Sequence, residues 1–546
     1  MCSKSLWSIP EAFLRDFFSK AWGSQESELR LRDRFMKKLI DIVSNRIFLT
    51  AVAVLLQLVW IFAVLWGVGA FSGHLMNLIS ILSLILVLWI VNKKINPSYK
   101  LAWTILILAV PVFGVIIYLL FGQSRVARKM TQDSQMVLQK IANYFKEDKK
   151  TREDLENTDL GASIQSAYIR DFAGFPVHEN TSTKYYAVGD DMFIDMLEDL
   201  KKAEHYIFLE YFIIREGRMW GEILAVLEEK VKQGVDVRLI YDDMGCVNTL
   251  PHKYYKKLQA KGIKCAAFNP VRPILNIVLN NRDHRKILVI DGHTGYTGGL
   301  NLADEYINEL ERFGHWKDTG VRLYGQGVWN LTVMFLQMWS VITRIQVQFP
   351  AYGPYVYHTE EFENDGFVQP YGDSPLDGEV VGENVYLNMI NQAKKYVYIS
   401  TPYLIIDNEM MTALCLASKK GVDVRVITPG IPDKKMVFLL TQSYYEQLIS
   451  AGVRIYEYTP GFIHAKNFVC DDEFAAVGTI NLDYRSLYLH FECGVWLYRC
   501  QAVGQVKEDM LRTFEISEEI TLDWCLKQNV VRRAGQSILR LFAPML

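Results

Sequence analysis

Two segments of this sequence carry the same three chemical groups at the same spacing. HRKILVID at 284–291 and HAKNFVCD at 464–471 both read His-x-Lys-x-x-x-x-Asp. A chain with such an internal repeat is built from similar units, which constrains its fold more than any other feature does. Further landmarks recur around the two segments in the same order: GVDVRLI (234–240) and GVDVRVI (421–427), KGIKCAAFNP (261–270) and AGVRIYEYTP (451–460), and DTGVRLY (318–324) and ECGVWLY (492–498).

Each repeat mixes two hydrophobic periods. Short apolar runs such as YIFLEYFII and KILVID are typical of buried strands, whereas MWGEILAVLEEKVKQG has the period of an amphipathic helix. We therefore predict an α/β fold with two homologous units packed about a pseudo-twofold axis. Such packing would bring the two His-x-Lys strands face to face.

The N-terminal part of the chain contains long uncharged stretches at about 47–71, 75–92 and 101–121. Each approaches the roughly 20 apolar residues that a helix needs to cross a bilayer. We predict N-terminal transmembrane helices and hence a multi-pass membrane protein. The third stretch contains Pro111 and Gly114 at its middle, so it can also bend and re-enter the membrane instead of crossing it.

These patterns suggest where the chain is divided. The first and last segments are basic and amphipathic in part, which suits a helix on a membrane surface or an ordinary surface helix. The predicted segments are an N-terminal amphipathic segment (1–45), a transmembrane region (46–122), a connector (123–180), the first unit (181–345), a linker (346–369), the second unit (370–515) and a C-terminal amphipathic tail (516–546).

Composition argues against several classes of protein. The formal net charge is −2, so the chain is no polycation and nucleic acid is not a predicted partner. The eight cysteines form no CxxC pair, so we predict neither a disulfide framework nor a zinc site.

Within each motif, the His and Lys side chains are expected on one face of a strand and the Asp at a turn. In a strand, His284 and Lys286 point to one face, and so do His464 and Lys466, because side chains alternate. Asp291 and Asp471 complete the motifs but fall at turns and with the opposite parity. We therefore expect the two aspartates to be structural and the His–Lys pairs to form the reacting face.

Two imidazoles and two ammonium groups in one site suit a phosphodiester. The lysines would neutralise the non-bridging oxygens, and one imidazole would attack phosphorus to form a phosphohistidine. The other imidazole would protonate the leaving alcohol and then deprotonate the incoming one. This chemistry requires neither a metal nor another cofactor.

The repeats also suggest supporting residues. Asn301 and Asn481 follow small residues after each motif and can donate hydrogen bonds to phosphate. Asp318 and Glu492 occupy equivalent positions in DTGVRLY and ECGVWLY. Because an imidazole that reacts through one nitrogen benefits from a carboxylate on the other, we expect Asp318 to pair with His284 and Glu492 with His464. The alternative is a pair of ordinary strand carboxylates.

The two His-Lys-Asp motifs resemble the phospholipase D superfamily. HRKILVIDGHTGYTGGLNLADEY, HWKDTGVRLYGQGVWNLTVMFLQMW and YTPGFIHAKNFVCDDEFAAVGTINLDYRSLYLHFE are similar to bacterial cardiolipin synthases. NPSYKLAWTILILAVPVFGVIIYLLFG is similar to the membrane segment that precedes their catalytic part. The resemblance extends from about residue 47 to the C-terminus.

The resemblance implies a reaction and a location. Two phosphatidylglycerols would yield cardiolipin and glycerol, with His284 attacking the first lipid and His464 acting as acid and then base, although the two roles could be exchanged. The partners would be phosphatidylglycerol, other membrane phospholipids and the bilayer of a bacterial cell membrane, with the catalytic part on the cytoplasmic face. The acceptor preference and the oligomeric state are left open.

Three other functions would explain some of these sequence features. A membrane-tethered nuclease would use the same motifs, but the neutral charge and the lack of a basic stripe argue against it. A hydrolytic phospholipase D or a phosphatidylserine synthase would change only the acceptor, and the products would tell them apart. A non-catalytic scaffold would tolerate a degraded motif, and here both motifs are intact.

Overall fold

A computed structural model describes residues 69–122, 131–134, 136–137, 145, 148–270 and 281–545, together with Leu55 and Leu58. The described chain divides into two compact units. The smaller unit takes its described residues from 69–93 and 103–122. The larger unit takes them from 94–102, 131–270 and 281–545.

The smaller unit is helical. It contains helix α3 (Gly69–Val91), the part of α4 (Pro97–Ala109) from residue 103 onward, and α5 (Pro111–Phe121). Val87, Ile90, Ile107 and Tyr118 are buried together between the helices. Pro111 begins α5 because its ring fixes φ and removes a backbone donor, so the predicted stretch 101–121 is two helices instead of one.

The stretches predicted to span the membrane fall in part among the described residues. The predicted stretch 75–92 falls almost entirely within α3. Of 47–71 only the end of the stretch, with Leu55 and Leu58, lies among the described residues, and 1–45 lies outside them. Within the described ranges, no helix has both the length and the apolar character that crossing a membrane requires.

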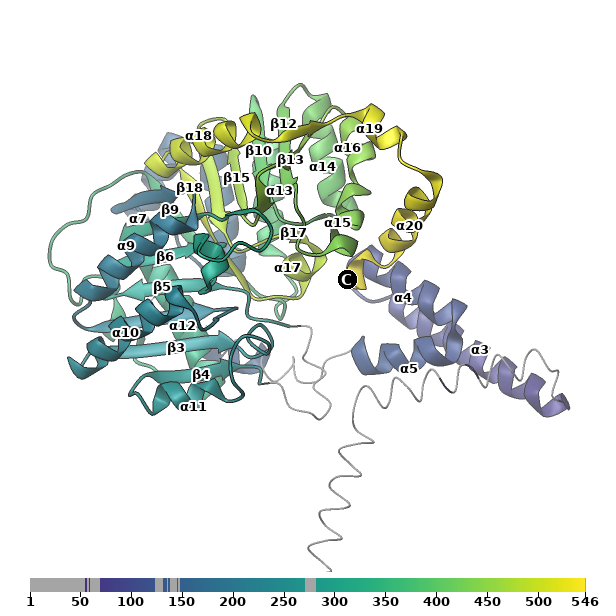
Figure 1. The fold of residues 1–546 in the computed structure, drawn as a ribbon, viewed down its shortest axis with the longest axis horizontal. Coiled ribbons are helices and arrows are strands. Elements are labelled where there is room, and N and C mark those ends of the chain that lie inside the picture. Colours follow the sequence, from purple (N-terminus) through teal and green to yellow (C-terminus); the bar gives the residue numbers. More distant parts are fainter. Residues whose placement is uncertain are drawn as a thin grey trace, which may run out of the picture. The chain divides into compact units, whose positions relative to one another are not determined.

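The larger unit contains two large sheets (Figure 1), and they share one strand order, as the repeat predicts. The first sheet has the order β1 (Thr181–Tyr186), β8 (Gly320–Gly325), β6 (Thr294–Gly298), β5 (Lys286–Ile290), β2 (Tyr206–Tyr211), β3 (Asp236–Asp242) and β4 (Lys264–Phe268). The second has the order β9 (Phe367–Asp373), β18 (Glu492–Tyr498), β16 (Phe474–Gly478), β15 (Asn467–Cys470), β10 (Tyr396–Ser400), β12 (Asp423–Pro429), β13 (Arg454–Tyr458) and β19 (Glu518–Ile520). Apart from the extra edge strand β19, each strand has its counterpart, which confirms the α/β fold with two homologous units.

Helices cover both sheets. Before and within the first repeat they are α7 (Lys149–Thr158), α8 (Leu160–Tyr168), η1 (Ile169–Ala173), α9 (Gly189–Lys202), α10 (Arg218–Lys232), α11 (Tyr254–Gln259), η3 (Asp304–Ile307), α12 (Val328–Thr343) and η4 (Phe349–Tyr352). In the second repeat and the tail they are α13 (Val381–Gln392), α14 (Asn408–Lys419), α15 (Lys435–Gln442), α16 (Tyr445–Ser450), α17 (Tyr484–Tyr488), α18 (Gln501–Glu515), α19 (Leu522–Leu526), α20 (Val530–Leu541) and η5 (Ala543–Met545).

The apolar helix α12 joins the repeats into one core. Its residues are buried along most of its length, and it packs on strands of the first sheet and on β9 of the second. Phe335 of α12 stacks on Phe208 of β2 with ring centroids 4.6 Å apart. Because one hydrophobic cluster contains side chains from both sheets, the repeats are held as a single body.

Short strands cross between the repeats next to the two motifs. β7 (His315–Lys317) of the first repeat pairs in parallel with β14 (Gly461–Ile463) of the second. In the corresponding place, Asp283 of the first repeat bridges Phe491 of the second. The segment that leads to each motif histidine therefore runs beside the other repeat. A further small sheet pairs β11 (Leu404–Ile405) with β17 (Leu482–Asp483).

Candidate active site

The two motif histidines are held by the crossing strands. His284 donates its backbone N–H to the Phe491 carbonyl at 2.9 Å, and His464 donates its own to the Lys317 carbonyl at 2.7 Å. Both side chains are buried, with 6% and 7% of each residue exposed. Each imidazole thus enters the site from a backbone that the other repeat fixes.

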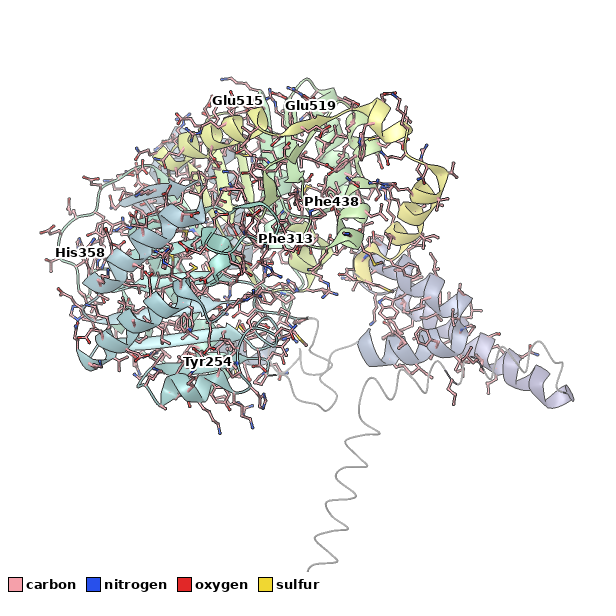
Figure 2. All side chains as sticks on the ribbon, in the orientation of Figure 1. Tyr254, Phe313, His358, Phe438, Glu515 and Glu519 are labelled. Carbon is pink, nitrogen blue, oxygen red and sulfur yellow. The ribbon has the colours of Figure 1, made fainter. Side chains whose placement is uncertain are left out.

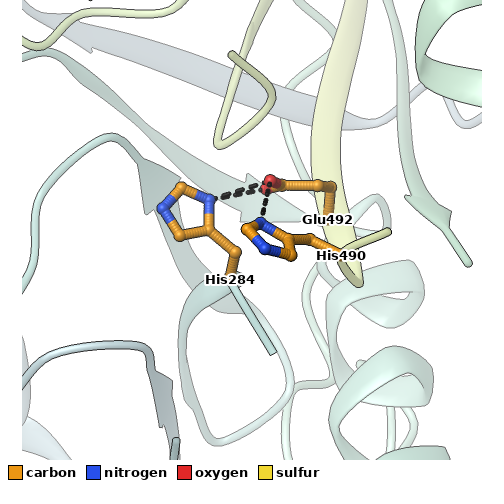
Figure 3. A group of neighbouring side chains, drawn as sticks. All are labelled: His284, His490 and Glu492. Carbon is orange, nitrogen blue, oxygen red and sulfur yellow. Dashed lines mark hydrogen bonds and ion pairs between the residues drawn. The ribbon is translucent and has the colours of Figure 1, made fainter. Parts of the chain in front are cut away.

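The predicted carboxylates do pair with the histidines, but in the opposite combination. His284 Nδ1 lies 2.8 and 3.0 Å from the two carboxylate oxygens of Glu492 (Figure 3). His464 Nδ1 lies 2.6 Å from Asp318 Oδ2. The predicted pairs within each repeat were therefore wrong. The physical reason is the strand crossing, which sets Ile463 beside Lys317 and Asp283 beside Phe491, one residue before each partner.

These contacts fix the tautomer of both imidazoles. Glu492 and Asp318 are fully buried, and a carboxylate is an acceptor, so each histidine carries its proton on Nδ1. Burial lowers the pKa of His284 to about 3 and that of His464 to about 4, in spite of the carboxylates. At neutral pH each histidine therefore presents a neutral imidazole with a lone pair on Nε2.

The motif lysines lie next to the backbone of the motif histidines and are almost fully buried. Lys286 Nζ donates to the His284 carbonyl at 2.6 Å, and Lys466 Nζ donates to the His464 carbonyl. Burial lowers the pKa of Lys286 to about 8 and that of Lys466 to about 7. The charge of Lys286 contributes to the lowered pKa of both Lys466 and His464, which shows that the two repeats share one electrostatic site.

Asp291 and Asp471 are turn residues, as their position in the motif predicts. Asp291 accepts the backbone N–H groups of residues 204, 205 and 206, each at 2.8 Å. Asp471 accepts those of residues 394, 395 and 396 at 2.6, 2.8 and 2.9 Å. Both have positive φ values, 48° and 56°. Each aspartate thus ties the end of a motif strand to the start of the neighbouring strand.

The predicted asparagines are placed differently from each other. Asn301 accepts from the Ile213 backbone at 2.9 Å and donates to the Tyr306 hydroxyl at 2.8 Å, so both ends of its amide already have a protein partner. Asn481 is 5% exposed, and its Oδ1 has no hydrogen-bond partner among the described residues. Hydrogen bonding of either asparagine to phosphate stays a prediction. It suits Asn481 better, because the amide of Asn301 is already hydrogen-bonded at both ends.

The small residues before these asparagines are not interchangeable. A Cβ on Gly299 would lie 1.9 Å from Asp318 Oδ1 and 3.0 Å from the His464 carbonyl oxygen, so only glycine fits there. The equivalent residue Thr479 instead donates its hydroxyl to Glu492 Oε2. Glu492 therefore serves a histidine and a hydroxyl, while Gly299 leaves Asp318 room beside its histidine.

His490 was missed by the sequence prediction. Its ring centroid lies 5.6 Å from that of His284, and its Nδ1 lies 3.8 Å from Glu492 Oε1 (Figure 3). These three residues also form a group that could hold a metal ion. The nearby positive charge of Lys286 and the hydrogen bonds that Glu492 already accepts from His284 and Thr479 both disfavour a metal cation at this place.

The repeat contained a signal for His490. When Asp318 is aligned with Glu492, the residue two places earlier is Trp316 in one repeat and His490 in the other. Trp316 stands 5.6 Å from the ring of His464, the separation between His490 and His284. The two halves therefore share a geometry but differ in chemistry.

A buried charged network backs the first motif strand. Arg285 points away from His284 and Lys286, since neighbouring side chains in a strand alternate, and its guanidinium contacts Glu210 and Asp283. Arg282 pairs with Asp242 at 3.4 Å. Because these charges are all buried, their mutual pairing is what allows them to remain inside the unit. None of them was predicted.

Comparison with known families gives two matches. The model described as "Cardiolipin synthase, PLD-like domain" matches residues 196–312 and 386–514. The model described as "Phospholipase_D-nuclease N-terminal" matches residues 81–123. The first match covers each of the two repeats and contains both histidine motifs.

Individual relatives agree with the family match. The chain is 36% identical over 452 residues to "Cardiolipin synthase 2" of Bacillus anthracis, covering 83% of this chain and 87% of the relative. It is 34% identical over 487 residues to "Cardiolipin synthase" of Halalkalibacterium halodurans, covering 88% and 95%. The crystal structure of phosphatidylserine synthase from Haemophilus influenzae Rd KW20 aligns with a TM-score of 0.54 and 16% identity, over 70% of this chain and 97% of that one. At this identity the structure supports the fold alone.

Proposed function

Since the chain belongs to the phospholipase D-type cardiolipin synthase family, we propose that it transfers a phosphatidyl group from one phosphatidylglycerol to another and releases glycerol. One observation supports this most strongly. Two His–Lys half-sites, each with a buried carboxylate on Nδ1, come together in a single buried site. This is the set of groups that a two-step exchange at a phosphodiester needs.

In the first step, His284 Nε2 attacks the phosphorus of a bound phosphatidylglycerol. A P–N bond forms, the P–O bond to the headgroup glycerol breaks, and the departing oxygen takes a proton from His464. The bound phosphodiester adds a negative charge next to His464 and so favours the protonated form of this acid. The product is a phosphatidyl-histidine and free glycerol.

In the second step, a headgroup hydroxyl of another phosphatidylglycerol attacks the same phosphorus. His464 takes the hydroxyl proton, a P–O bond forms and the P–N bond to His284 breaks. Lys286 and Lys466 offset the charge on the non-bridging oxygens in both steps. Cardiolipin leaves, and both imidazoles return to their starting protonation.

The two carboxylates support this division of roles. Asp318 lies 2.6 Å from His464 Nδ1, and its other oxygen accepts, among the described residues, only the backbone N–H of Thr319. The Glu492 carboxylate accepts hydrogen bonds from His284 and from the Thr479 hydroxyl and also lies near His490. A carboxylate committed to one imidazole favours the imidazolium, so His464 is better suited to acid–base work and His284 to nucleophilic attack.

A site beside a bilayer explains transfer in preference to hydrolysis. Lipid hydroxyls there are held at high effective concentration, so they compete with water for the intermediate. We therefore place the enzyme in a bacterial cell membrane, with α3 and the α4–α5 pair at or in the bilayer and the catalytic unit on the cytoplasmic face. Other membrane phospholipids that carry a free headgroup hydroxyl are possible acceptors by the same chemistry.

The test uses the full chain in phosphatidylglycerol vesicles without added metal. Mass spectrometry follows cardiolipin, glycerol and phosphatidic acid for the natural protein and for His284→Ala and His464→Ala. One glycerol per cardiolipin, with both products lost in each variant, is the expected result. Phosphatidic acid as the main product would instead make the protein a hydrolase, and cardiolipin formed by both variants would refute the mechanism.

A further inference from the structure

Helix α20 packs its polar side against the larger unit. None of the residues 530–541 is buried, although the helix lies beside α15 (Figure 1). A surface helix normally turns its apolar side to the protein, but of the apolar residues of α20 only Leu539 packs against the hydrophobic core. The contacts that hold it are those of Arg532 with Gln442, Arg533 with Glu446 at 3.0 Å, Gln536 with the Leu439 carbonyl at 3.3 Å, and Arg540 with the ring of Tyr444 at 4.4 Å.

The apolar side of α20 is exposed. Val530 and Val531 are 81% and 82% exposed, Ile538 is 60% exposed and Leu541 is 44% exposed. With 3.6 residues per turn, these residues and Ala534 fall on one face of the helix. Figure 2 shows this helix at the margin of the larger unit, beyond the helix α15 that carries Phe438.

The charge of the helix indicates what covers it. Residues 530–541 contain three arginines and no acidic residue. Arginines on the polar face of a helix whose other face is apolar are the pattern of helices that lie on anionic lipid. A second copy of the chain fits less well, because a twofold pairing of this face would bring the arginines of the two copies together.

We propose that α20 lies in the headgroup layer of an anionic phospholipid bilayer, with its apolar face toward the acyl chains. The arginines would then lie at the level of the lipid phosphates while keeping their contacts with α15 and α16. This surface goes beyond the transfer reaction and does not depend on it. It would hold the second repeat against the membrane independently of residues 69–122.

The test places a polarity-sensitive thiol label on the helix in the full chain. Ile538→Cys is labelled in a background with Cys2→Ser and Cys415→Ser, since the remaining cysteines are buried. Ile194→Cys, at a site on α9 that is 56% exposed, is the matched control. The protein is reconstituted in vesicles of phosphatidylcholine with phosphatidylglycerol, and in phosphatidylcholine alone.

We expect the label at 538 to shift to shorter emission wavelengths and to be quenched by brominated acyl chains in the anionic vesicles, and the label at 194 to do neither. A label at 538 that stays in water overturns the proposal. An equal shift in both vesicle types overturns the need for anionic lipid, and a shift that grows with protein concentration without quenching by lipid shows a second copy instead. If Ile538→Cys fails to fold, Val531→Cys reports on the same face.

Discussion

At the scale of single residues, each reactive imidazole is aligned by a carboxylate from the other repeat. His284 depends on Glu492, and His464 depends on Asp318. The identities of the four residues follow from the repeated motifs, but their pairing does not. The pairing is set by the strand contacts of Asp283 with Phe491 and of Ile463 with Lys317, which belong to opposite repeats. The spacing of residues within one motif does not predict such contacts.

The crossed pairing makes the two carboxylates separable by experiment. A phosphatidyl donor with a p-nitrophenol headgroup needs no acid for its departure. With this donor we expect Asp318→Asn to retain a fast burst of p-nitrophenolate but to lose turnover, because only its partner His464 is impaired. Glu492→Gln should slow the burst itself by about 100-fold or more, since the tautomer of His284 is no longer fixed. Stopped-flow absorbance measures both, and the reverse outcome would restore the pairing within each repeat.

The buried lysines give the reaction an alkaline limit. Burial lowers the pKa of Lys466 to about 7 and that of Lys286 to about 8, and only the charged forms neutralise a phosphodiester. Since deprotonation of the acid His464, whose pKa is lowered to about 4, already reduces kcat/KM at lower pH, we expect the fall of kcat/KM to become steeper as the pH rises through 7 and 8. This ratio reports the free enzyme, so it should show the limit directly. Lys466→Arg should move the fall to higher pH, because a guanidinium stays protonated; an unmoved limit would show that another group controls it.

At the scale of elements, the motif strands are fastened by their terminal aspartates. Asp291 and Asp471 each accept three backbone N–H groups and adopt positive φ. Parity and turn sequence were enough to predict this structural role. The same reasoning does not predict the environment of the asparagines. Both ends of the Asn301 amide are hydrogen-bonded, one to the backbone of Ile213 and the other to the hydroxyl of Tyr306, and these partners are not part of the motif.

Replacing either aspartate should therefore affect stability more than chemistry. Asp291→Ala leaves three backbone donors without their acceptor, and hydrogen bonds to charged groups contribute roughly 1.5–3 kcal/mol each. We expect a lower melting temperature for Asp291→Ala and a smaller decrease for Asp471→Ala, whose site is more exposed. The initial rate per folded molecule should stay within a few-fold of the natural protein at low temperature. A lost rate with an unchanged melting temperature would instead give the aspartate a chemical role.

At the scale of the whole molecule, the repeat predicted the architecture. Two sheets with one strand order and a shared core were found, because duplicated hydrophobic patterns fold in the same way. The prediction of three N-terminal spans is less well supported. Pro111 divides the apolar stretch 101–121 into two helices, and most of the stretch 47–71 lies outside the described residues. The chemical difference between His490 and Trp316 can be read from the aligned repeats, but their equal distances from the motif histidines and the exposed apolar face of α20 are seen only in the folded chain.

The central claim is that one site joins two unequal halves through a covalent intermediate on His284. The most direct measurement mixes the His464→Ala variant of the full chain with the p-nitrophenol donor and maps the adduct by mass spectrometry under alkaline conditions. We expect about one p-nitrophenolate per chain, no further turnover, and a phosphatidyl group on the peptide that contains residue 284. Continued turnover without an adduct, or an adduct at any other residue, would contradict it.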